Sequence, residues 1–143
     1  MNSTSLLRTR LNPLIPWQRR TVVVAAWSTL LSGALWLPVH YWLGAGAGEL
    51  PHPLEPWLIR WHGISAAFAL FAVGVVAAGH VARGWSLRQR RATGLTVCVL
   101  VGLSAATGYA LSYFVSEPWR PAVGWIHAVL GAAMVGAGVF HKR

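Results

Sequence analysis

Six histidines are the residues of this chain best suited to chemistry, and four of them recur at matched positions within apolar sequence. The six are His40, His52, His62, His80, His127 and His141. An ionisable side chain inside an apolar, membrane-length segment is costly to bury, so each such histidine is a functional candidate. On a helix, the 18 residues from His62 to His80 make five full turns, and the 14 from His127 to His141 return to within about 40° of one face.

Two imidazoles that face each other across a gap can serve as the two axial ligands of a six-coordinate haem iron. If the helices that carry these histidines run in the same direction, His62 lies level with His127 and His80 lies level with His141. We therefore expect two bis-histidine sites and two haem b groups per chain. Zinc is a poorer candidate, because each level offers two ligands where zinc takes three or four.

The histidines are carried by four apolar segments that are long enough to cross a bilayer. The segments cover about residues 21–43, 57–81, 92–115 and 121–141. A hydrocarbon core of about 30 Å needs roughly 20 helical residues, and the segments lack the alternation of membrane strands. Only 10% of the residues are charged, too few for a soluble surface. The predicted fold is all-α, an integral membrane four-helix bundle over residues 21–143 with a basic N-terminal tail over residues 1–20.

Basic residues gather on one side of these segments. Ten of the twelve precede the first segment, lie between the second and third, or follow the fourth; Arg60 and Arg120 lie on the other side with all three acids, Glu49, Glu55 and Glu117. The positive-inside rule then predicts a multi-pass protein of the bacterial inner membrane with both termini in the cytoplasm. It also predicts that the second and fourth helices run the same way. Since topology accounts for the net charge of +9, we expect membrane lipid and no nucleic acid as a partner.

Several short stretches carry a family resemblance. They are His52-Pro-Leu-Glu-Pro-Trp57, Trp61-His62-Gly63, Gly79-His80, Thr107-Gly-Tyr-Ala-Leu-Ser-Tyr113, Trp125-Ile-His127 and the terminal His141. Together, from about Leu30 to the end of the chain, they resemble the small bacterial four-helix di-haem cytochromes b. The resemblance implies that the axial haem ligands are His62, His80, His127 and His141. The spacing of 18 in the second helix departs from the spacing near 14 in the cytochrome b of bc complexes, and it shifts the level of one pair.

A few polar residues near the outer face have open roles. Arg60 and Arg120 are candidate partners of haem propionates, because guanidinium groups pair well with carboxylates; snorkelling to the interface explains them equally well. His40 is an interfacial anchor, an alternative outer ligand or the border of a quinone pocket. His52 and Glu55 are ordinary loop residues or acceptors of protons from a quinol.

The predicted function is transmembrane electron transfer by a cytochrome b with two bis-histidine haems. The expected partners are a quinone or quinol and, on the periplasmic side, a c-type cytochrome or a redox enzyme. Whether the chain also catalyses a reaction, such as oxidation of superoxide or a quinol at the outer haem, stays open, because no further catalytic constellation is present. The alternative is a haem-free helix bundle that acts as a proton path or an assembly subunit.

Overall fold

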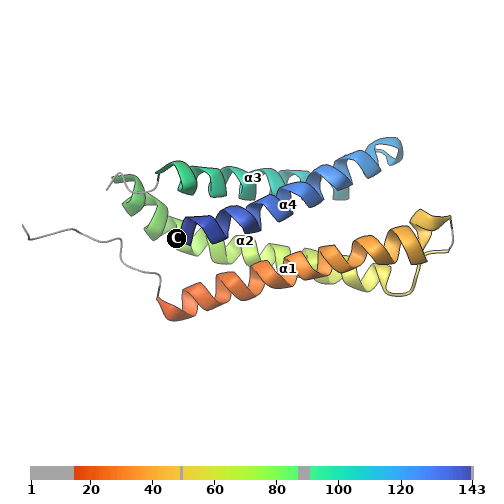
Figure 1. Cartoon of the computed structure of the whole chain (residues 1–143), viewed down its shortest axis with the longest axis horizontal. Coiled ribbons are helices and arrows are strands. Elements are labelled where there is room, and N and C mark those ends of the chain that lie inside the picture. The colour runs from red at the N-terminus through yellow and green to blue at the C-terminus, as the bar shows by residue number, and fades with distance from the viewer. Residues whose placement is uncertain (1–14, 49, 87–90, 143) are drawn as a thin grey trace, which may run out of the picture.

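In the computed structural model, four long helices make up most of the chain (Figure 1). They are α1 (Pro16–Leu43), α2 (Glu55–Ser86), α3 (Arg91–Tyr113) and α4 (Arg120–Lys142), with the short 3-10 turns η1 (Ala45–Ala47) and η2 (Glu117–Trp119). The structure describes the backbone of residues 15–48, 50–86 and 91–142, and the side chains of residues 15–48, 50–81 and 91–140. No strand occurs within these ranges, so the predicted all-α, four-helix fold is confirmed.

All four helices are long and apolar enough to cross a membrane. Large apolar side chains lie open on their outward faces; Phe71 is 69% exposed and Val129 is 64% exposed. Among the described hydrophobic residues, Ala25 and Ala72 alone are buried. Apolar surface of this extent is typical of a protein that lies in lipid. The chain therefore has the character of a multi-pass membrane protein.

The helix ends differ from the expected ones by a few residues. α1 begins at Pro16, five residues earlier than expected, and α2 continues to Ser86 rather than 81. Proline suits the first turn of a helix, because the N–H that it lacks would have no partner there. α3 ends at Tyr113, two residues earlier than expected. The predicted tail now lies mostly in residues 1–14, outside the described residues.

The four helices form two antiparallel hairpins. α1 packs along α2 and α3 packs along α4, whereas contacts between α1 and α4 and between α2 and α3 are sparse. Figure 1 shows the α1–α2 pair beside the α3–α4 pair, with α2 and α4 running in the same direction. Over the described residues the backbones of α2 and α4 do not come close to each other, so these helices occupy opposite corners of the bundle. The parallel course that the histidine pairing requires is present.

Hydroxyl groups fix the register of α1 on α2. The indole Nε1 of Trp61 donates a hydrogen bond of 2.9 Å to Ser28 Oγ, and Thr29 Oγ1 donates one of 3.1 Å to Ser65 Oγ. Ser65 is buried, and a buried hydroxyl without a partner is costly. These bonds bracket His62 on α2 and so determine which part of α1 it meets.

Candidate functional site

His62 of α2 and His127 of α4 meet between the two hairpins. Their ring centroids lie 6.0 Å apart and their ring planes are inclined at 80°. Both side chains are half-buried. The two helices lie at opposite corners of the bundle, so both rings must point inward across the diagonal. The structure thus brings together His62 and His127, which sequence analysis placed level with each other.

The ring of His62 is held by α1 through its Nδ1 atom. This atom lies 2.9 Å from the backbone carbonyl oxygen of Thr29 and 3.3 Å from Ser32 Oγ. A carbonyl oxygen only accepts hydrogen bonds, so the Nδ1 of His62 must carry the proton. The neutral ring then keeps a lone pair on Nε2, the form in which histidine binds a metal through that nitrogen.

The ring of His127 is held by α3 in the same way. Its Nδ1 lies 2.9 Å from Thr107 Oγ1. The Thr107 hydroxyl donates its own proton to the carbonyl of Leu103 at 2.8 Å, so it accepts from His127, and the carbonyl of Ser104 is a further acceptor. His127 therefore also carries its proton on Nδ1 and a lone pair on Nε2.

A glycine lies against each ring, on the helix that holds it. A Cβ atom added to Gly33 of α1 would lie 3.0 Å from Cε1 of His62, and one added to Gly108 of α3 would lie 3.1 Å from Cε1 of His127. Both distances are too short for an ordinary van der Waals contact. Glycine at these two positions leaves each ring room to approach the neighbouring helix closely while its Nδ1 keeps its hydrogen bond.

The residues that hold the two rings form a repeated pattern that sequence analysis missed. Thr29-Leu-Leu-Ser32-Gly33 on α1 corresponds to Ser104-Ala-Ala-Thr107-Gly108 on α3. A proline also lies six residues before each histidine, Pro56 before His62 and Pro121 before His127. This repeat can be seen in the sequence. However, hydroxyl and small residues are common where membrane helices meet, so only their contacts with the histidine rings show that these residues belong to the site.

The His62–His127 pair suits a metal ion that already has most of its ligands from a cofactor. The two neutral imidazoles present lone pairs, and among the described side chains no carboxylate or thiolate accompanies them. The described residues contain no cluster of three or more His, Cys, Asp or Glu side chains that could hold an ion by themselves. A haem iron needs only two protein ligands, since the porphyrin supplies the other four.

The second predicted pair, His80 and His141, is described only in part. His80 is half-buried on α2. His141 lies in the last turn of α4, but its side chain lies outside the described residues. The pairing of His80 with His141 stays a prediction.

Arg60 and Arg120 have separate partners in this structure. The guanidinium carbon of Arg60 lies 5.5 Å from the ring centroid of Trp57, a cation–π distance. Arg120 donates hydrogen bonds to the carbonyl of Leu111 at 2.8 Å and to the carboxylate of Glu117 at 3.1 Å. Arg120 therefore holds the end of α3, and propionate binding by either arginine stays a prediction.

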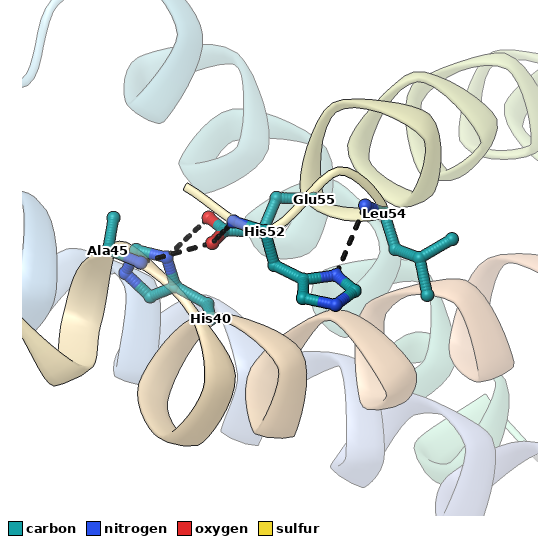
Figure 2. A network of polar contacts seen from close by, with 5 residues as sticks. All are labelled: His40, Ala45, His52, Leu54 and Glu55. Atoms are coloured by element: carbon teal, nitrogen blue, oxygen red, sulfur yellow. Dashed lines mark hydrogen bonds and ion pairs between the residues drawn. The ribbon is translucent and has the colours of Figure 1, made fainter. Parts of the chain in front are cut away.

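A second polar cluster lies where the C-terminal end of α1 and η1 meet the N-terminal end of α2 (Figure 2). Glu55 is buried, and its Oε1 accepts backbone hydrogen bonds from Ala45 at 3.1 Å and from His52 at 2.9 Å. Its Oε2 lies 2.8 Å from Nδ1 of His40. The ring of His52 instead accepts a bond from the backbone N–H of Leu54 at 3.2 Å. His40 is thus a partner of a carboxylate, a role that sequence analysis did not weigh.

No protein-family model, curated protein or solved structure matches this chain.

Proposed function

We propose that this chain is a membrane cytochrome b that binds one haem between His62 and His127 and a second between His80 and His141. Its function is to carry electrons across the bacterial inner membrane. The observation that supports this most is the pair of facing rings at 6.0 Å, each with its proton held on Nδ1 by the neighbouring helix. Each ring therefore offers a lone pair on Nε2, and neither ring carries a proton on that nitrogen.

Each residue of the outer site has a distinct task. His62 and His127 would hold the haem through their Nε2 atoms. The Thr29 carbonyl and the Thr107 hydroxyl fix the tautomer and orientation of the rings, as outer partners of metal-bound histidine do. Gly33 and Gly108 leave room for the rings. When bound, the haem supplies the one-electron chemistry, while the protein sets its ligands and the polarity around it.

The proposed partners follow from this function. A quinone or quinol in the membrane would exchange electrons with one site, and a periplasmic c-type cytochrome or redox enzyme would exchange them with the other. The apolar outer surface of the helices gives a lipid-soluble partner direct access to the protein.

The direct test is optical. The purified full-length protein should be red, and its reduced-minus-oxidised spectrum should be that of a low-spin b haem. His62→Ala and His127→Ala should each remove the same spectral component, because either change leaves the iron with one protein ligand. His52→Ala is the matched control, since the ring of His52 contacts a loop N–H. A colourless protein made with ample haem would overturn the proposal.

The inner site is tested separately. His80→Ala and His141→Ala should each remove a second component and leave the first intact. If both variants keep the full haem content of the wild type, the protein holds one haem and the inner pair is refuted.

A haem-free proton path is the second candidate function. The observation in its favour is the series of polar groups along the α1–α2 contact, which includes the His40–Glu55 pair, His62 and Ser65. Proton flux into proteoliposomes by a colourless protein would support this candidate. If haem binds at His62, this residue cannot belong to a proton path, because its free ring nitrogen would then be occupied.

A further inference from the structure

We infer that His40 and Glu55 form a proton site coupled to the His62–His127 site, which takes up a proton when an electron arrives there and releases it when the electron leaves. The inference rests on the proposed function, because it needs a redox centre at His62 and His127. It adds that electron transfer at this end of the bundle is linked to proton exchange.

The hydrogen bonds of the pair identify the atom that gains the proton. Glu55 Oε1 already accepts two backbone N–H groups, and Oε2 faces Nδ1 of His40 at 2.8 Å (Figure 2). A carboxylate with three such donors is stabilised in its ionised form. The added proton therefore goes to Nε2 of His40, and the pair changes from a net charge of −1 to a neutral imidazolium–carboxylate pair.

His40 is the more exposed member of the pair. The side chain of Glu55 is 10% exposed, while that of His40 is 24% exposed. The proton therefore comes from the aqueous phase and reaches His40 first. It returns to the same phase on oxidation, so one proton at most accompanies each electron and the only bond formed or broken is the N–H bond of His40.

Helix geometry places the pair close to the proposed redox centre. Glu55 precedes His62 by seven residues on α2, which is two turns along the same face and about 10 Å along the axis. His40 follows Gly33 by seven residues on α1 in the same way. The ring of Trp36 fills the intervening turn of α1 and stacks on His40, with centroids 4.3 Å apart.

Few other titratable groups face the pair. From α1, Tyr41 meets the ring of His40 edge-on at 4.9 Å, and Trp125 of α4 stacks on that tyrosine. From the loop, His52 presents its backbone N–H. Within the described residues, the other acid at this end, Glu117, is paired with Arg120, so its charge is already balanced.

The expected coupling is of measurable size. A unit negative charge about 10 Å away, in surroundings with an effective dielectric constant of about 20, raises the proton affinity of the pair about tenfold. The midpoint potential of the His62–His127 centre should then fall as pH rises over the interval in which reduction adds a proton to the pair. Above and below that interval it should be flat.

The experiment is a redox titration of the purified full-length protein at several pH values, following the spectral component that His62→Ala removes. We expect a pH-dependent potential in the wild type and a flat one in His40→Gln. This variant keeps the backbone bonds of Glu55, so the α1–α2 turn stays anchored. Glu55→Gln should also weaken the dependence, because the imidazolium loses its counter-charge. Glu117→Gln is the matched control and should behave as the wild type.

The outcomes separate this inference from the proposed function. A wild-type potential that does not change with pH, or an unchanged dependence in His40→Gln, would overturn the proton site while leaving the haem site standing. A protein without haem would overturn the proposed function and with it the redox link. The inference is supported if the midpoint potential no longer changes with pH in His40→Gln but still does so in Glu117→Gln.

Discussion

The rings of His62 and His127 meet at 6.0 Å, although their helices lie at opposite corners and the helix backbones do not come close to each other over the described residues. Each ring is set by the other helix of its own hairpin, α1 for His62 and α3 for His127. The two hairpins thus contribute equivalent halves to one site. Each half of the site can therefore be tested separately.

The glycines beside the rings should be intolerant of a side chain. Gly108→Ala places a Cβ 3.1 Å from His127 Cε1. The ring must then shift from its hydrogen bond, at a cost of about 1–3 kcal/mol in the free energy of unfolding. We expect a lower melting temperature and a lower haem content. Gly102→Ala, also on α3 but with open space around it, is the control; equal losses in both variants would contradict a specific role of Gly108.

The hydroxyl of Thr107 should matter for ligand binding rather than for folding. Thr107→Val keeps the side-chain shape but removes the acceptor at 2.9 Å from His127. Loss of such a partner typically lowers metal affinity by about 10–100-fold, and haem titration of the apoprotein would measure it. Thr107→Ser should restore the affinity. Thr96→Val on the same helix removes a hydroxyl that bonds to its own helix, and it should leave haem affinity unchanged.

Arg120 should contribute to stability at the end of α3. Its guanidinium donates to the carbonyl of Leu111 at 2.8 Å, and the last carbonyls of a helix otherwise lack partners. Arg120→Gln should lower the free energy of unfolding by about 1 kcal/mol, as measured by thermal denaturation. Arg60→Gln is the comparison on α2. A changed haem potential in Arg120→Gln with unchanged stability would instead favour contact with a propionate.

The orientation in the membrane can be tested with single cysteines. Cys98 is the one native cysteine and is replaced by alanine in the background. Leu50→Cys lies at the η1 end and Arg19→Cys at the opposite end of α1. In intact cells a membrane-impermeant maleimide should label the cysteine at position 50 and not that at position 19, because the positive-inside rule places the basic end in the cytoplasm. The reverse pattern would refute the predicted topology.

Much of this architecture could be predicted from the sequence. Apolar segments of membrane length determine the number of helices, since a chain in lipid must satisfy its own backbone hydrogen bonds. The periodicity of the helix then puts two histidines on one face of α2 and two on one face of α4. That reasoning correctly selected His62 and His127 as neighbours. It missed the end of α3 by two residues, where the carbonyl of Leu111 is held by Arg120, a residue nine positions further along the chain.

Only the tertiary structure decided how the rings are held. The partners of the two rings come from other helices: the Thr29 carbonyl and Gly33 for His62, and Thr107 and Gly108 for His127. Periodicity describes one helix at a time, whereas these contacts depend on how far one helix slides along its neighbour. The same holds for His40 and Glu55, 15 residues apart in sequence and 2.8 Å apart across the α1–α2 contact. The sequence determined which residues could do chemistry, and the packing of the helices determined their protons and partners.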